Sequence, residues 1–145
     1  MNDKRFFDTN LVVYLYSQDE PDKQSIAKNL FKNHQPIIST QVLGEIANVL
    51  RRKFQLEYTD IVAAITQITE VSQVATISDD NIIHALHLAD KYQYSFYDSL
   101  IIAVALAENC TILYTEDLQH GQIIESTLTI QNPFLTLVQP RRGSI

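Results

Sequence analysis

Acidic side chains at four distant positions are the residues of this sequence best placed to do chemistry. Asp8 follows the apolar pair Phe6-Phe7, Asp117 follows the apolar stretch 112–114, Glu45 lies in a predicted helix, and Asp98 heads the apolar stretch 100–107. An ionised carboxylate that enters a protein core is costly unless a partner compensates its charge. Carboxylates suit cations that prefer oxygen ligands, such as Mg²⁺ or Mn²⁺. Metal ligands and phosphate contacts are therefore one interpretation of these acids.

Three of the acids also have a plain structural interpretation. Asp8 could simply cap a first helix, because Asp is a favoured N-cap residue. Asp98 could cap the apolar helix, where the helix dipole favours its charge by about 0.3–1 kcal/mol. Capping and metal binding are compatible, since one carboxylate oxygen can do each. Asp117 could be a turn residue of the loop 117–121, and Glu116 competes with it for any ligand role.

Glu45 is the most informative of the four. A helical Glu usually lies on a solvated face, but Glu45 lies one turn from Val42 and Val49, at the edge of an apolar stripe. The neighbouring Gly44 costs about 1 kcal/mol relative to Ala in a helix interior, which suggests the close approach of a backbone or a ligand. Together these features favour a functional role for Glu45.

Other polar residues carry weaker signals. Asp79 and Asp80 also follow an apolar stretch, but Ser78 can supply the cap and the two acids fit the start of a helix. The four histidines do not form a metal-binding set, although His120 lies close enough to Asp117 in sequence to touch a phosphate. The run 51–53, Arg-Arg-Lys, complements a helix C-terminus. Because it shares a helix with Glu45, it could also contact a nucleic-acid backbone.

Length and composition predict one folded domain over 1–145, with about 138–145 as a mobile tail. A chain of 145 residues can bury about 68–70% of its unfolded surface. The net charge of −6 is unusual for a nucleic-acid binder, but bound cations would offset clustered carboxylates. A single cysteine, no secretory h-region and no apolar run of membrane-spanning length lead us to expect a cytoplasmic protein that does not enter a membrane.

Short apolar runs alternate with amphipathic segments along the chain. The runs predict strands over 4–7, 36–38, 74–77, 111–114 and 127–130. Helices are predicted over 11–16, from Pro21, after Thr40, from Thr59, after Ser78 and over 98–107. Such alternation is typical of an α/β protein with three layers and a mainly parallel, roughly five-stranded sheet. Sites in such sheets form beyond the carboxyl ends of the strands, where Asp8 and Asp117 would lie.

Four short motifs, taken in order, resemble those of the PIN-domain family, and most closely its VapC-type toxin ribonucleases. They are Asp8-Thr9-Asn10, the stretch Ser-Thr-Gln-Val-Leu-Gly-Glu that ends at Glu45, Tyr97-Asp98-Ser99 and Thr115-Glu116-Asp117. The resemblance covers nearly the whole chain. It implies a PIN-like fold and a metal-dependent endoribonuclease that is the toxin of a toxin–antitoxin pair.

The resemblance also implies roles for individual residues. The metal-binding and catalytic set would be Asp8, Glu45, Asp98 and Asp117, with Mg²⁺ or Mn²⁺ as cofactor. Thr9, Asn10 and Thr115 would support this set, and Glu116 would share or replace the role of Asp117. Water would attack the RNA phosphodiester and leave 5′-phosphate and 3′-hydroxyl ends. Independently of the resemblance, Arg51, Arg52 and Lys53 are candidates for holding the RNA, because they share a helix with Glu45. The implied protein partners are an antitoxin and a second copy of the chain.

Two other functions are compatible with parts of this pattern. One is a non-catalytic PIN-like module that binds RNA. The other is a phosphoacceptor receiver domain, which also gathers acids and Mg²⁺ at the rim of a parallel sheet and would use Asp79. A receiver needs a lysine after a late strand, and the residues after 111–114 and 127–130 supply none.

Overall fold

Strand β1 (Arg5–Phe7) lies inside a six-stranded sheet of the computed structural model, which describes residues 3–137. The strand order is β3-β2-β1-β4-β6-β5, and every pairing is parallel except that of β5 with β6. The other strands are β2 (Ile37–Ser39), β3 (Gln73–Ala75), β4 (Ile112–Tyr114), β5 (Ile123–Ile124) and β6 (Leu128–Gln131). The predicted α/β architecture is confirmed. The expected count of five strands was one too low, because β5 has two residues and is too short to show a periodic pattern.

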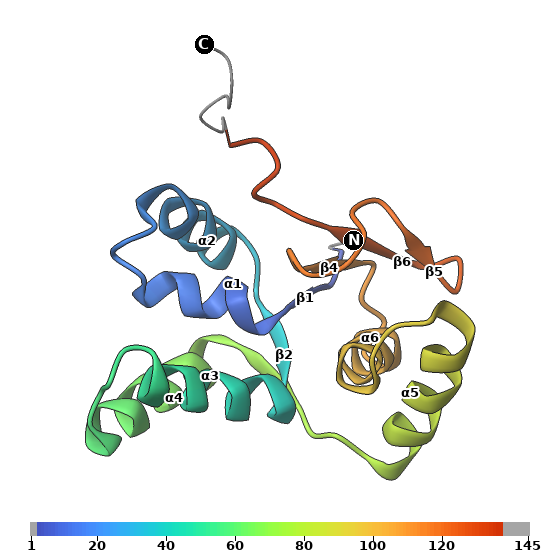
Figure 1. The fold of residues 1–145 in the computed structure, drawn as a ribbon, viewed down its shortest axis with the longest axis horizontal. Helices are drawn as coiled ribbons and strands as arrows, with labels where there is room; N and C mark the ends of the chain where they lie inside the picture. Colours follow the sequence, from blue (N-terminus) through green and yellow to red (C-terminus); the bar gives the residue numbers. More distant parts are fainter. Residues whose placement is uncertain (1–2, 138–145) are drawn as a thin grey trace.

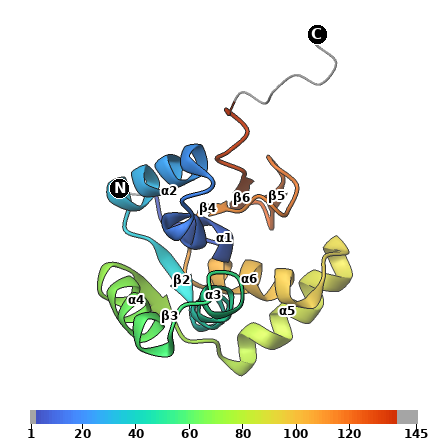
Figure 2. The ribbon, with the colours of Figure 1, turned by 60° about the vertical axis from the view of Figure 1, so that its left-hand side comes forward.

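Helices connect the parallel strands and cover both faces of the sheet. The chain forms α1 (Thr9–Val13), a 3₁₀ turn (Tyr14–Tyr16) and α2 (Pro21–Asn33) between β1 and β2. It forms α3 (Thr40–Arg52) and α4 (Tyr58–Val71) before β3, then α5 (Asp79–Tyr92) and α6 (Phe96–Ala107) before β4. Figures 1 and 2 show α5 and α6 together on one side of the sheet, with α1 to α4 on the other. This arrangement follows from right-handed crossovers that reverse direction after β3.

Helix α6 is the buried helix that its composition predicts. Its residues from Ser99 to Ala105 are all buried, and it packs against α5 and β2. The side chain that caps it is Ser95, whose hydroxyl accepts a hydrogen bond from the backbone nitrogen of Asp98 at 3.2 Å. The interpretation of Asp98 as the N-cap is therefore wrong. Asp98 lies in the first helical turn, which leaves its carboxylate available for other contacts.

The strand register brings the ends of β1 and β4 to the same edge of the sheet. Phe7 pairs with Tyr114, and the backbone nitrogen of Asp8 donates to the Tyr114 carbonyl at 3.0 Å. The next residues along the two strands, Asp8 and Thr115, therefore leave the sheet side by side. The tail expected at 138–145 lies outside the described residues. Within residues 3–137, no helix has the length and apolar character needed to cross a membrane.

Candidate active site at the carboxyl edge of the sheet

All four predicted acids line one pocket. Its volume is about 300 Å³, and it lies where β1, α3, α6 and the loop after β4 meet. The lining residues are Asp8, Thr9, Asn10, Gln41, Glu45, Asn48, Val49, Tyr97, Asp98, Ile101 and Asp117. A larger cavity of about 590 Å³ lies around Lys4, Arg5 and His34, where β1 begins. Since the predicted acids all line the smaller pocket, that pocket is the candidate site.

Asp8 is the most deeply buried of the acids, with 6% of its surface exposed. It caps α1, as its structural interpretation proposed: Oδ1 accepts from the backbone nitrogen of Thr9 at 2.7 Å. Oδ2 accepts from the Thr115 hydroxyl, also at 2.7 Å. The pKa of Asp8 is raised to about 6, mainly by burial. The hydrogen bonds from Thr115 and Thr9 lower the pKa, and the charges of Asp117 and Glu45 raise it. Asp8 therefore combines a capping role with a place in the pocket.

Glu45 is held at the pocket by two neutral side chains. Thr9 donates its hydroxyl to Oε1, and Gln41 donates its amide to Oε2 at 3.1 Å. No backbone or side chain approaches Gly44 closely, because a Cβ placed there meets nothing within 4 Å. That part of the interpretation of Gly44 is wrong. The surface of α3 at Gly44, next to Glu45 in sequence, is open to solvent.

The two candidates for the fourth acid point in different directions. Asp117 lines the pocket, where Oδ2 accepts from the Asn10 amide at 3.4 Å. Partial burial and the charges of Glu116 and Asp98 raise the pKa of Asp117. Glu116 instead contacts the Tyr14 hydroxyl and forms an ion pair with Lys23 at 3.0 Å. The geometry thus brings Asp117, and not Glu116, together with the other three acids.

The match to a known family decides the identity of the fold. The sequence model of the PIN domain matches residues 5–124. The chain belongs to the PIN-domain family. No curated protein matches the chain in a sequence comparison.

Solved structures of toxin proteins share this PIN fold. The chain superposes on VapC20 of Mycobacterium tuberculosis, described as a sarcin-ricin loop cleaving toxin, with a TM-score of 0.66 and 23% identity, over 79% of this chain and 92% of that one. A toxin–antitoxin complex from Klebsiella pneumoniae gives a TM-score of 0.67 at 22% identity, over 90% and 98%. VapBC2 of Rickettsia felis, bound to a DNA fragment of its promoter, gives 0.65 at 20%, over 88% and 97%. These similarities confirm the predicted fold.

Membership of the PIN family also decides against the receiver-domain alternative. Asp79 lies in the first turn of α5, after the edge strand β3, and its Oδ1 accepts from the backbone nitrogen of Asp80 at 3.0 Å. Ser78 caps this helix in a capping box with Asn81. The interpretation of Asp79 and Asp80 as helix-starting acids is confirmed. His120 accepts a hydrogen bond from the backbone nitrogen of Asn132 at 3.0 Å and does not line the PIN pocket.

Three polar residues that line this pocket were not among the predicted site residues. Gln41 and Asn48 lie on α3, one turn on either side of Glu45, and Tyr97 precedes Asp98 with 65% of its surface exposed. The helical spacing from Glu45 is a signal that could have identified Gln41 and Asn48.

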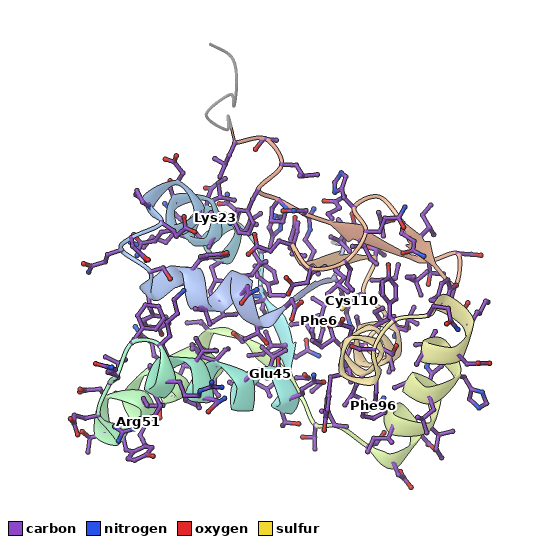
Figure 3. All side chains as sticks on the ribbon, viewed as in Figure 1. Phe6, Lys23, Glu45, Arg51, Phe96 and Cys110 are labelled. Atoms are coloured by element: carbon purple, nitrogen blue, oxygen red, sulfur yellow. The ribbon has the colours of Figure 1, made fainter. Side chains whose placement is uncertain are left out.

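The cationic run 51–53 divides into two parts. Arg51 donates to the Leu56 carbonyl at 3.0 Å and stacks over the Tyr58 ring, with 4.3 Å from its guanidinium carbon to the ring centroid. Figure 3 shows Arg51 at the end of α3 that lies away from Glu45. Arg52 and Lys53 line a second hollow of about 310 Å³ together with Asn48 and Val49. Asn48 and Val49 also line the pocket of the four acids. The two hollows are therefore neighbours along α3.

Proposed function

We propose that this PIN domain is a metal-dependent endoribonuclease that hydrolyses RNA phosphodiester bonds as the toxin of a toxin–antitoxin pair. The observation that carries the proposal is the convergence of Asp8, Glu45, Asp98 and Asp117 from four distant segments on one pocket. The description of VapC20 as a toxin that cleaves the sarcin-ricin loop supports RNA as the substrate class.

The donor chemistry of the pocket fits Mg²⁺ or Mn²⁺. All four charged side chains offer oxygen atoms. The charges of Asp117 and Glu45 raise the pKa of Asp8, and the charge of Asp98 raises the pKa of Asp117. A bound cation would offset this repulsion. Within residues 3–137, no three acidic, histidine or cysteine side chains converge closely enough to hold an ion as they stand. Binding would therefore draw the carboxylates of Asp8, Glu45, Asp98 and Asp117 together. When bound, the cation polarises a phosphate oxygen and lowers the pKa of a water molecule.

Neutral side chains in the pocket and next to it keep the acids oriented for cation binding. Thr115 and Thr9 donate hydroxyl hydrogens to Asp8 and Glu45, and Asn10 donates its amide to Asp117. The pocket lining contains no Ser, Cys or His, and its Thr9 hydroxyl already donates to Glu45. We propose water as the attacking group. Water attacks the phosphorus and gives up a proton, the bond from phosphorus to the 3′ oxygen breaks, and the leaving 3′ oxygen takes up a proton. The products carry 5′-phosphate and 3′-hydroxyl ends.

We assign the binding of RNA phosphates to Arg52 and Lys53. Their hollow adjoins the acidic pocket through Asn48 and Val49, so phosphates beside the cleaved one can reach these two cations. Arg51 is already engaged with the Leu56 carbonyl and the Tyr58 ring. We therefore expect it to contribute less, although the sequence pattern treats the three cations alike.

We further propose an antitoxin partner, a homodimer and a cytoplasmic location, where a toxin meets cellular RNA. The structural neighbours from Klebsiella pneumoniae and Rickettsia felis are described as a toxin–antitoxin complex and as VapBC2. Large apolar side chains are exposed in two groups on different sides of the sheet, and each group is a candidate protein-binding surface. They are Tyr58, Val62 and Val71 on α4, and Ile82, Ile83 and Leu86 on α5. Light scattering of the purified chain, alone and after co-expression with the product of a neighbouring gene, measures both associations.

The deciding experiment compares RNA cleavage by the wild type and by Asp98→Asn. Purified protein is freed of metal with EDTA, and cleavage of structured RNA is measured before and after addition of Mg²⁺ or Mn²⁺. Asp79→Asn is a matched control, because it also removes a carboxylate from the first turn of a helix. We expect metal to restore cleavage in the wild type and the control, but not in Asp98→Asn. Equal cleavage by Asp98→Asn and wild type would contradict the proposal.

The second candidate function is a non-catalytic RNA-binding module of the same fold. Arg52 and Lys53 favour it as much as they favour a nuclease, because they bind phosphate in either case. Metal and RNA binding without turnover on varied RNAs would support this alternative.

A further inference from the structure

Gln41 connects two of the helices that carry acids of the pocket. It lies one turn before Glu45 on α3, and its amide nitrogen donates to Glu45 Oε2 at 3.1 Å. The same nitrogen lies 3.3 Å from the backbone oxygen of Tyr97, in the first turn of α6. Among the residues that the structure describes, this is the one side-chain hydrogen bond between α3 and α6.

The contacts of Gln41 fix the orientation of its amide. Both atoms that face it, Glu45 Oε2 and the Tyr97 carbonyl oxygen, are acceptors. Only the NH₂ group of the amide can donate, so a flipped amide would lose both bonds. In this orientation Gln41 Oε1 is buried and has no hydrogen-bond partner within residues 3–137. An unsatisfied buried acceptor is unfavourable, and Gln41 therefore keeps its two donor bonds against a local cost.

Asp98 depends on this connection more than the other acids do. Asp8, Glu45 and Asp117 each accept a hydrogen bond from a neutral side chain: Thr115, Thr9 and Asn10. In the described part of the chain, no such bond reaches the Asp98 carboxylate, and the contact of Asp98 with Ser95 is made through its backbone nitrogen. The position of Asp98 relative to Glu45 is thus set by the first turn of α6. Figure 3 labels Phe96, which begins that turn, and Glu45 on α3.

We propose that Gln41 is a positioning residue that sets the placement of the Glu45 and Asp98 carboxylates relative to each other for divalent-cation binding. This inference rests on the proposed function. Mg²⁺ requires near-ideal octahedral geometry, so a small change between two ligating helices weakens binding. Loss of an outer hydrogen-bond partner of a metal ligand typically lowers metal affinity or activity by about 10–100-fold.

The test is Mn²⁺ binding, measured by electron paramagnetic resonance in the absence of RNA. Gln41→Met keeps the length of the side chain and removes both donor bonds, and Gln41→Ala is the second variant if Gln41→Met folds poorly. Gln24→Met is the matched control, because Gln24 also donates its amide to a backbone oxygen, that of Leu15 at 2.9 Å, outside the pocket. Thermal melts of the wild type and all variants record their stability.

We expect Gln41→Met and Gln41→Ala to bind Mn²⁺ about tenfold more weakly than the wild type. Their kcat on RNA should fall in proportion, with KM within about twofold of the wild-type value, because Gln41 acts on the ligands of the cation and not on the RNA. Gln24→Met should retain wild-type Mn²⁺ affinity even where its melting temperature falls equally. Wild-type Mn²⁺ affinity in both Gln41 variants would overturn this inference and leave the proposed function intact. Absence of Mn²⁺ binding by the wild type would overturn the proposed function and this inference with it.

Discussion

Thr115 donates its hydroxyl hydrogen to Asp8 Oδ2 at 2.7 Å, although the two residues are 107 positions apart in the chain. The same hydroxyl oxygen accepts a hydrogen bond from the backbone nitrogen of Asp117 at 3.1 Å. One buried hydroxyl therefore links the acid that follows β1 to the acid in the loop after β4. The bond to Asp8 depends on the parallel pairing of β1 with β4, whereas the bond from Asp117 is local to the loop.

We expect Thr115→Val to destabilise the protein by about 1–2 kcal/mol, because a buried carboxylate oxygen loses its donor. The Thr115 hydrogen bond also lowers the pKa of Asp8, so the variant should keep Asp8 protonated to higher pH. Urea denaturation and RNA cleavage measure the two effects. Thr129→Val on β6 is the control, since no side-chain hydrogen bond of Thr129 is found within residues 3–137. Equal stability of the two valine variants would contradict the role of Thr115.

Asp8→Asn should stabilise the metal-free protein at pH 7. Burial raises the pKa of Asp8 from its ordinary 3.8 to about 6 in the folded state. A carboxyl whose pKa is raised by folding favours the folded state when protonated, so its ionisation destabilises the fold as pH rises from about 4 through about 6. We expect a stabilisation of about 3 kcal/mol at pH 7, which shrinks as the pH falls to 5.

Urea denaturation in EDTA at pH 5, 6 and 7 checks this prediction. Asp79→Asn, at an exposed position on α5, is the control and should shift stability by a similar small amount at all three pH values. A constant difference between wild type and Asp8→Asn over this range would show that Asp8 does not titrate there.

Asp117→Asn should mainly lower activity, whereas Glu116→Gln should mainly lower stability. Asp117 lines the pocket, so we expect its neutral variant to lower metal-dependent cleavage by at least about 100-fold. This loss is larger than the usual effect of removing an outer hydrogen-bond partner of a metal ligand. Glu116 is 18% exposed in its ion pair with Lys23. Its neutral variant should lose about 1 kcal/mol of stability and keep most of the cleavage. Cleavage rates and urea midpoints of the two variants decide the assignment, and a larger loss of cleavage in Glu116→Gln would reverse it.

Arg52→Gln and Lys53→Gln should weaken RNA binding, and Arg51→Gln should weaken it less. The affinity of a non-cleaved RNA is measured in the Asp98→Asn background at several salt concentrations. Each lost phosphate contact should reduce the slope of log affinity against log salt by about 0.7 for single-stranded RNA. If Arg51→Gln reduces the slope as much as Arg52→Gln does, the division of the cationic run is wrong.

The sequence alone determined the fold class, the buried helix and the four motifs. Strands and helices of this chain are specified by local apolar patterns, and α6 is apolar on every side, so burial was its one stable outcome. The placement of Asp8 and Asp117 at one edge of the sheet also followed from sequence, because parallel strands with right-handed crossovers end at a common edge.

Only the tertiary structure decided which of two adjacent acids enters the pocket, and how α3 is joined to α6. Glu116 and Asp117 are neighbours in sequence, but Lys23, 93 positions away, holds Glu116 outside the pocket. The bond from Gln41 to the Tyr97 carbonyl spans 56 positions. Such contacts join elements that are far apart in the sequence and close together in the folded protein. No local pattern of residue types encodes them.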